Sequence, residues 1–536
     1  MQHTHRIARG RILAFLITFA LALACVVPAG MSAGGSAVYA TSAKETPSEW
    51  PSFRGDPATK GITEAPTAKT AGDAKKNWEY RFRKDGGLIA AGPLLIGDRI
   101  YLAISDTADY MTPPSKLRIV ALNKKGQVVK SVSVTGANGT NTGLPIAAQS
   151  IGYGGGNIYV PLTDGTICAY DAKTLKFKWR SARIAEGADV ISSITYKDGY
   201  IYSGASTGMA DSGCFFALNA KNGRVAWKYG QKGYYCAGAA FTDKAVFFAG
   251  EDGILVSHAL KSAKTYDSYK LDGAVRCETV ISGSTLYVTT KEGKLYKVPV
   301  AKNGKTFTDK DVKSATLYGP QCTSEPIVYN NKVYTFSAEA AFGGTSTLEV
   351  WNAKTLARKS SVDAGAYIQD QPLLTTAYAH KGNGYKVYLY VLQNDAKDDV
   401  LVITDSAKMA KPSVGKLYSP GGDYALASPI AAKDGTLYFY HSVTNPTDWS
   451  TDARLVSLGN AAKKYTVKFN ANGGKVSTKS LKLYSGAKYG KLPAPTRKGY
   501  KFKGWYTKKS GGVKISAGST VKIKKAATLY ARWSRK

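Results

Sequence analysis

The side chains that most often carry out catalysis are few in this chain and widely scattered. Beyond residue 40 there are three histidines, in unrelated sequence contexts: His258, His380 and His441. The H-E-x-x-H pattern of zinc proteases does not occur. The acidic cluster Asp395, Asp398 and Asp399 is typical of a solvated loop, with a calcium site as the alternative. The sequence therefore predicts no catalytic, cofactor-binding or metal-binding residue, and it predicts that the chain is not an enzyme.

Cysteine is the remaining reactive residue type, and three of the cysteines share a spacing. Cys236, Cys277 and Cys322 each stand 10–12 residues before an aromatic residue of the next apolar run. Comparable places on successive repeats would bring neighbouring thiols together at the centre of the fold, so a disulfide that uses Cys277 is one expectation. Buried thiols without a bond are the other. Since no C-x-x-C occurs, neither a zinc site nor a thioredoxin-type site is predicted.

The strongest chemical signal is positive charge, which is concentrated at the C-terminal end. The whole chain carries a formal charge of +35, and residues 461–536 contain 21 Lys and Arg but no Asp or Glu. Lysines alternate there with apolar residues, so one face of a strand can pack while the other attracts polyanions by salt-sensitive forces. The alternative is that this charge serves only solubility. The candidate anion-binding residues are Lys508, Lys509, Lys522, Lys524 and Lys525.

The elements that must position these residues are short strands in a repeating pattern. Residues 154–181 show it best, with an apolar strand, an Asp-Gly turn, a second strand, an Asp-Ala-Lys turn and a strand ending at Trp179. This pattern predicts an antiparallel meander. Seven less regular copies begin near Gly97, Asp198, Asp243, Gly283, Asn331, Lys386 and Asp434. A further apolar run precedes most copies, so the sequence predicts an all-β fold, an eight-bladed β-propeller with four strands per blade.

The ends of the repeat region predict how this ring closes. The last copy ends near Leu458 without a tryptophan-tipped fourth strand, and residues 77–82 supply a spare one before the first copy. We expect that N-terminal strand to complete the last blade and to protect its edge. An additional edge strand is the alternative. The propeller is thus expected over 77–460, after an N-terminal segment at 41–76 and before a small basic domain at 461–536.

The N-terminus has the organisation of a secretory signal peptide, expected over residues 1–40. Arg6, Arg9 and Arg11 precede an apolar run, and small residues lead to a cleavage site after Ala40. A retained membrane anchor is the alternative, because the apolar run is nearly long enough to span a bilayer. No second apolar stretch of that length follows. The mature protein is therefore expected to be secreted and associated with the cell surface.

The repeat region also carries a family resemblance. The run WPSFRGD at 50–56 and the repeated G-x-I/V-Y and D-G-x-I/L elements resemble PQQ-like β-propeller repeat proteins over about residues 48–460. That family includes quinoprotein alcohol dehydrogenases and a non-enzymatic lipoprotein that assists outer-membrane protein assembly. Its enzymes are expected to have adjacent cysteines and calcium-binding carboxylates, and this chain has no Cys-Cys pair. PQQ and calcium are therefore not expected. A quinoprotein oxidoreductase and an envelope assembly factor are the alternative functions.

The basic C-terminal segment carries a second resemblance. The runs VKFNANGG at 467–474, P-x-P-x-x-KGY-x-F-x-GWY at 493–506 and LYA-x-W at 529–533 resemble the Listeria–Bacteroides repeat, also called the internalin-type B repeat. The resemblance implies a small β-grasp-like domain of extracellular, mostly Gram-positive, surface proteins. Its aromatic residues are Tyr500, Phe502, Trp505, Tyr506 and Trp533. They could stack on a ligand, but the small size of the domain favours core packing.

These features together predict a secreted bacterial surface protein that binds other molecules. The propeller would be a rigid interaction platform for a protein or glycan, and the basic repeat would tether it to an anionic cell-wall or host polysaccharide. Nucleic acid is not expected as a partner, because the chain is expected outside the cell. A monomer is expected.

Overall fold

The described part of the chain is all-β, as the sequence predicts. The computed structural model describes residues 48–56, 59–82, 88–106, 116–136, 139, 142–145, 151–207, 212–230, 232–340, 343–369, 371–394, 399–421, 428–444 and 451–536. The expected signal peptide lies outside these residues. The helical elements within them are single 3-10 turns: η1 (Ala71–Asp73), η3 (Asp309–Asp311) and η4 (Lys381–Asn383). Among the described residues, no helix has the length and apolarity of a membrane span.

Eight sheets follow one another along the described residues up to Asn460. The first contains β1 (Ser48–Trp50), β4 (Leu88–Ala90), β5 (Leu94–Ile96), β6 (Arg99–Asp106), β7 (Lys116–Asn123) and β8 (Val128–Val134). The second contains β9 (Gly152–Gly154), β10 (Asn157–Pro161), β11 (Ile167–Asp171) and β12 (Phe177–Arg180). The third contains β13 (Asp189–Val190), β14 (Thr195–Lys197), β15 (Tyr200–Ser206), β16 (Gly213–Asn219) and β17 (Val225–Tyr229). The fourth contains β18 (Ala239–Phe241), β19 (Ala245–Phe248), β20 (Ile254–Ala259) and β21 (Thr265–Lys270).

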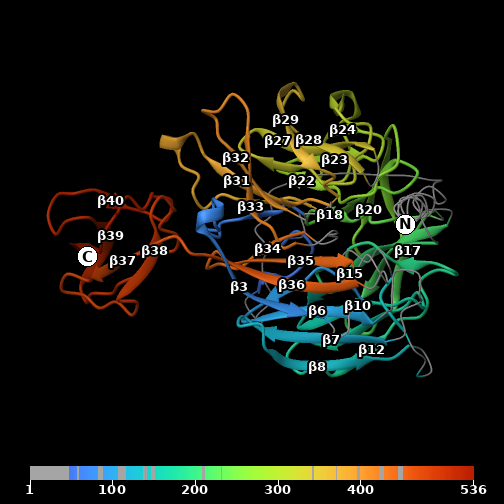
Figure 1. Cartoon of the computed structure of the whole chain (residues 1–536), viewed down its shortest axis with the longest axis horizontal. Helices are drawn as coiled ribbons and strands as arrows, with labels where there is room; N and C mark the ends of the chain where they lie inside the picture. The colour runs from blue at the N-terminus through green and yellow to red at the C-terminus, as the bar shows by residue number, and fades with distance from the viewer. Residues whose placement is uncertain are drawn as a thin grey trace, which may run out of the picture.

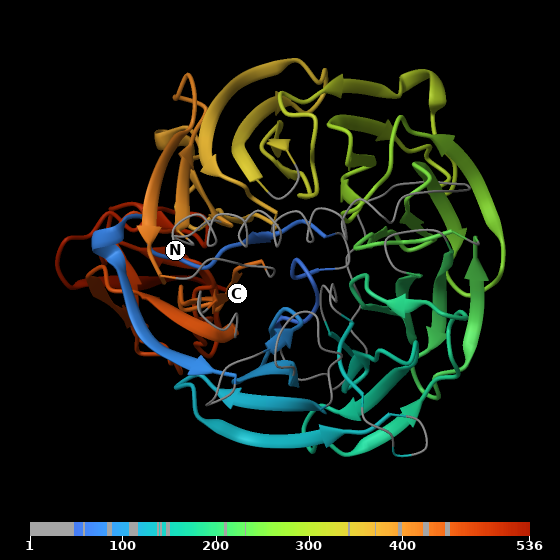
Figure 2. The ribbon, with the colours of Figure 1, turned by 45° about the vertical axis from the view of Figure 1, so that its right-hand side comes forward.

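The other four sheets complete an arrangement around a common centre (Figure 2), which we call the ring. The fifth contains β22 (Val280–Ser282), β23 (Thr285–Thr290), β24 (Lys294–Pro299) and β25 (Lys313–Thr316). The sixth contains β26 (Ile327–Tyr329), β27 (Lys332–Ala340), β28 (Gly343–Asn352) and β29 (Arg358–Ala366). The seventh contains β2 (Ile62–Thr63), β30 (Leu373–Thr375), β31 (Val387–Leu392), β32 (Val400–Asp405) and β33 (Ser413–Tyr418). The eighth contains β3 (Ala74–Arg81), β34 (Ile430–Ala431), β35 (Leu437–Thr444) and β36 (Thr451–Asn460).

Local turn chemistry explains why these short segments pair as they do. Between β10 and β11, Gly165 adopts a φ of 71°, which glycine tolerates without strain. The Asp164 carboxylate accepts a hydrogen bond from the Thr166 N–H (3.0 Å) and fixes the turn. The strands on either side then pair in register from Asn157 opposite Asp171 to Pro161 opposite Ile167.

Tryptophans on outer strands join neighbouring sheets. The Trp179 indole on β12 donates to the Ala220 carbonyl of the third sheet (3.0 Å), and the Trp227 indole on β17 donates to a carbonyl that follows β20 (3.0 Å). The Trp78 indole on β3 donates in the same way to the turn between β7 and β8 (2.9 Å). Because β3 also pairs with β36, this indole connects the eighth sheet with the first.

The segment before β3 crosses the middle of the ring, where its blue trace is visible in Figure 2. Its strand β1 pairs with β5 of the first sheet, and β2 pairs in parallel with β30 of the seventh. Between them, the Thr59 hydroxyl donates to the Thr279 carbonyl beside the fifth sheet (2.7 Å). The segment therefore ties together sheets that lie far apart in the sequence.

Residues 461–536 form a separate mixed sheet, the C-terminal module, beside the ring (Figure 1). Its strands are β37 (Lys464–Asn470), β38 (Ser480–Tyr484), β39 (Tyr500–Tyr506), β40 (Lys514–Ile515) and β41 (Ala527–Arg535). Their order is β38-β37-β41-β39-β40, with β37 parallel to β41. The module contacts the ring through Tyr484 and Ala487, which pack against Ala377 and Tyr378. The Lys488 N–H also donates to the Ala377 carbonyl (2.8 Å).

Candidate functional site

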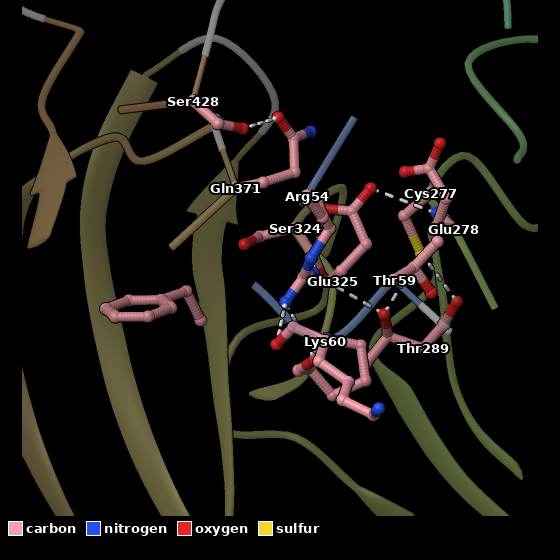
Figure 3. A network of polar contacts seen from close by, with 12 residues as sticks. Arg54, Thr59, Lys60, Cys277, Glu278, Thr289, Ser324, Glu325, Gln371 and Ser428 are labelled. Carbon is pink, nitrogen blue, oxygen red and sulfur yellow. Dashed lines mark hydrogen bonds and ion pairs between the residues drawn. The ribbon is translucent and has the colours of Figure 1, made fainter. Parts of the chain in front are cut away.

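A buried polar cluster lies where the N-terminal segment crosses the ring (Figure 3). The Arg54 guanidinium lies 3.4 Å from the Glu325 carboxylate, and both side chains are 1% exposed. Its Nη2 atom donates to the carbonyls of Pro326 (3.3 Å) and Lys60 (3.2 Å). Gly61 makes room for the guanidinium, because a Cβ there would lie 2.6 Å from Nη2. The cluster thus fastens the segment to the sixth sheet.

A second carboxyl group belongs to the same cluster. Glu278 is fully buried, and its backbone N–H donates to Glu325 Oε1 (3.0 Å). Its side chain accepts a hydrogen bond from the hydroxyl of Ser193, which lies between β13 and β14. The chain leaves space for this carboxyl at Gly238, where a Cβ would lie 2.0 Å from Glu278 Oε1. Two carboxyl groups therefore lie in one buried cluster with a single guanidinium, which is paired with Glu325.

This arrangement sets the protonation of the cluster. Burial, followed by the nearby Glu325 charge, raises the pKa of Glu278 well above its ordinary value of 4.5. Burial likewise lowers the pKa of Arg54, and the Glu325 charge opposes that change. The guanidinium of Arg54 and the carboxyl group of Glu325 are paired away from water, an arrangement that suits a structural fastening of the N-terminal segment.

The histidines and the acidic cluster do not converge in the described structure. His258 is buried against the Trp227 ring, with ring centroids 4.1 Å apart, and burial lowers its pKa. Asp395 and Asp398 lie outside the described residues, and Asp399 is 2.6 Å from the Lys416 ammonium. Within the described ranges, no three His, Cys, Asp or Glu side chains are gathered as a set of metal ligands.

The three cysteines lie at comparable places, shortly before β18, β22 and β26, but the structure joins none of them in a disulfide. Of the two expectations for Cys236, Cys277 and Cys322, the structure has the buried thiols without a bond. All three are buried, and Cys277 Sγ lies 3.2 Å from the Thr289 hydroxyl of its own sheet. Cys322 instead donates to the Phe336 carbonyl (3.1 Å). Burial raises the pKa of Cys277 well above its ordinary value, so this thiol stays protonated.

The lysines expected to bind anions lie in two loops of the C-terminal module. Lys508 and Lys509 follow β39, whereas Lys522, Lys524 and Lys525 precede β41, and all five are exposed. Burial, followed by the charge of Lys522, lowers the pKa of His380 in the ring. That the five lysines bind anions stays a prediction.

The aromatic residues of the module divide between the two faces of its sheet. Trp505 is in the core with Val467 and Leu529, and Phe502 and Trp533 pack against that core. A register shift between Phe502 and Gly504 reverses the order in which the side chains of β39 alternate between the two faces of the sheet. It puts Tyr506 opposite Tyr530 on the other face. Sequence reasoning did not find this face, because simple alternation puts Tyr506 and Phe502 on the same side.

Two cavities differ in the size of ligand that they could hold. The one beside Arg54, lined also by Trp50, Phe53 and Ser428, has a volume of about 10 Å³, room for one water molecule. The other, of about 450 Å³, lies between turns of the second and third sheets and is lined by Trp179, Tyr196, Asp171, Lys178 and Lys221, among others. Its volume is in the range of small-molecule sites.

Comparison with protein families confirms both sequence resemblances. The model of outer membrane protein assembly factor BamB matches residues 115–368, and the model of the Listeria-Bacteroides repeat domain matches residues 465–532. No curated protein matches the chain. The two repeats together fit a surface or envelope protein.

Solved structures share the fold of the ring. A europium-containing methanol dehydrogenase is 11% identical, with a TM-score of 0.55 over 78% of this chain and 98% of its own. The quinohemoprotein alcohol dehydrogenase of Comamonas testosteroni is 12% identical, with a TM-score of 0.55 over 78% and 82%. The quinohemoprotein alcohol dehydrogenase ADHIIG of Pseudomonas putida HK5 is 12% identical, with a TM-score of 0.52 over 77% and 80%. At these identities the likeness shows the β-propeller fold.

These neighbours correct one prediction. The sequence predicted that the chain is not an enzyme, and that prediction is wrong, because the ring has the fold of an enzyme family. The physical reason is that cofactor chemistry on a ring of sheets uses residues from several blades, which no local motif reveals. Two of these neighbours are quinohemoproteins, and the 10 Å³ cavity beside Arg54 is too small for a planar quinone.

Proposed function

We propose that this chain is a secreted, cell-surface binding protein. In this proposal the ring is an eight-bladed β-propeller closed by β3, and the C-terminal module tethers it to an anionic cell-wall or host polysaccharide. The observation that carries the proposal is the charge of the module, which has 21 Lys and Arg and no Asp or Glu. No carboxylate side chain of the module offsets that charge, so its field extends into the solvent.

The packing of the module supports a tether with fixed geometry. The module has its own core around Trp505 and is held against the ring by Tyr484, whose hydroxyl donates to the Asn460 carbonyl (2.8 Å). The Lys488 ammonium is 3.1 Å from the Glu64 carboxylate of the N-terminal segment. A cationic surface fixed in this way can engage several anions of one polymer at once.

The ring would serve as the platform for a second partner. Its sheets are tied across the centre by the Arg54–Glu325 pair, which favours a rigid body. The match to the BamB model supports a protein partner. Within the described residues, the 450 Å³ cavity beside Trp179 and Tyr196 has room for a side chain or a glycan unit of such a partner.

Neutralising the five loop lysines tests the tether. In the full chain, changing Lys508, Lys509, Lys522, Lys524 and Lys525 to glutamine should greatly weaken co-sedimentation with purified cell walls at about 0.1 M salt, where charges act over about 10 Å. The reason is that these side chains are exposed and unscreened by acidic residues of the module.

A matched control separates the module from net charge alone. Five exposed lysines of the ring are changed to glutamine instead: Lys125, Lys173, Lys302, Lys310 and Lys359. This variant should still sediment with cell walls almost as the native chain does. Equal losses in both variants would show that total charge, and not the module, determines binding.

An oxidoreductase is the second candidate, favoured by the fold shared with methanol and alcohol dehydrogenases. A titration of the full chain with PQQ and calcium, followed by the absorbance of bound cofactor, distinguishes it from the binding protein. Saturable binding would favour the oxidoreductase, and no binding would favour the tethered platform.

A further inference from the structure

The outer face of the module's sheet combines tyrosines with cations. Residues on β37, β41, β39 and β40 stand side by side in the register Asn470, Tyr530, Tyr506 and Lys514. We call this row, together with Arg532, the tyrosine face. Asn470 and Lys514 are exposed, and the two tyrosines and Arg532 are half-buried. The opposite side of the same strands forms the module's core, so this face is not required for packing.

Arg532 is held in place without an acidic partner from its own module. Its guanidinium carbon lies 3.9 Å from the centre of the Tyr506 ring, a close cation–π contact. Its Nη2 atom also approaches the Lys508 carbonyl (3.4 Å). Because residues 461–536 contain no Asp or Glu, no carboxylate side chain of the module can neutralise it. The result is a pre-oriented planar donor that matches carboxylate and sulfate groups.

Two lysines lie on the same face of the sheet. The Lys514 side chain passes over Gly504, where a Cβ would lie 2.6 Å from Lys514 Cε. Gly504 is opposite Arg532 in the register, so Lys514 and Arg532 are close neighbours. Lys468 is exposed on β37, two residues before Asn470. The face therefore offers one oriented guanidinium and two lysine side chains on the same side of the sheet as Tyr530.

We propose that the tyrosine face binds an acidic polysaccharide, with a sugar ring packed on Tyr530 and its carboxylate or sulfate group on Arg532. The inference rests on the proposed tether and specifies its ligand. A polymer of phosphate groups alone would need only the cations. Tyr530 and the exposed amide of Asn470 add an apolar ring and a polar group, the two features that a sugar ring recognises.

The experiment compares Tyr530→Ala and Arg532→Lys in the full chain, with the polymers alginate, heparin and polyphosphate as probes and single-stranded DNA as a fourth, separate probe. Arg532→Lys keeps the charge but loses the planar donor, so its affinity for alginate and heparin should fall about tenfold. Tyr530→Ala should lower the same affinities about three- to tenfold and leave polyphosphate binding unchanged. Tyr530→Phe retains the ring and should bind as the native chain does, which also shows that the face tolerates substitution.

The outcomes separate this inference from the tether itself. If the native chain binds none of the three polymers, the tether is wrong. If it binds all three and both variants match it, the module acts by diffuse charge and the tyrosine face is not a sugar site. If Tyr530→Ala weakens a single-stranded DNA probe more than alginate, the face is a nucleic-acid surface and the polysaccharide assignment is overturned.

Discussion

Replacing Arg54 by alanine is expected to lower the free energy of unfolding by about 3–5 kcal/mol. The guanidinium and the Glu325 carboxylate are 3.4 Å apart and both are 1% exposed, so the substitution leaves a buried carboxylate without its counter-charge. It also removes the hydrogen bonds to the Pro326 and Lys60 carbonyls, which fasten the N-terminal segment to the ring. Chemical denaturation of the full chain, followed by tryptophan fluorescence, measures the loss.

An exposed ion pair provides the control for this substitution. Arg81 lies 3.4 Å from Asp452 but is 53% exposed, so Arg81→Ala should cost less than about 1 kcal/mol. The double variant Arg54→Met with Glu325→Leu should recover much of the stability, because it removes both buried charges together. If Arg54→Ala lowers the free energy of unfolding no more than Arg81→Ala does, the cluster does not fasten the N-terminal segment to the ring.

The second large effect concerns Glu278 and depends on pH. Burial, followed by Glu325, raises its pKa in the folded chain well above 4.5, so the folded state binds a proton that the unfolded state releases. Stability should therefore fall as the pH rises above about 4.5, until the raised pKa is passed. Glu278→Gln has the same shape and no proton to lose. Its advantage over the native chain should grow by up to about 1.4 kcal/mol per pH unit.

Urea denaturation at several pH values measures this difference. The native chain and Glu278→Gln should have similar stability below about pH 4, where the native carboxyl is protonated in both states. The control Glu186→Gln changes a side chain that is 90% exposed, and it should follow the native curve. A Glu278→Gln curve that runs parallel to the native one would contradict a neutral, buried Glu278.

The strands could be predicted because their signals are local. Asp164 and Gly165 form the turn that their types indicate, and Trp179 lies in the last strand of its sheet, one residue before the end of β12. The Listeria–Bacteroides repeat was readable for the same reason, since its glycine turns and aromatic positions are close in sequence. The family models that match residues 115–368 and 465–532 agree with the predicted propeller repeats and the predicted Listeria–Bacteroides repeat.

The polar cluster and the tyrosine face could not be predicted, because each depends on contacts that no local pattern encodes. Arg54 and Glu325 meet only after the sheets have assembled around the N-terminal segment. In the sequence, Arg54 stands out only as part of the run WPSFRGD, and that run does not indicate Glu325 as its partner. On the module, a single register shift in β39 moves Tyr506 to the face opposite Phe502. Alternation counted along the chain misses such a shift.

In the proposed function, the acid-free module holds the protein on an anionic polymer by charge. The most direct test is the affinity of the full chain for purified envelope polysaccharide as salt is raised from about 0.1 M to about 1 M, where the screening length falls from about 10 Å to about 3 Å. We expect a steep, continuous loss of affinity over this range. An affinity that does not change with salt would contradict it.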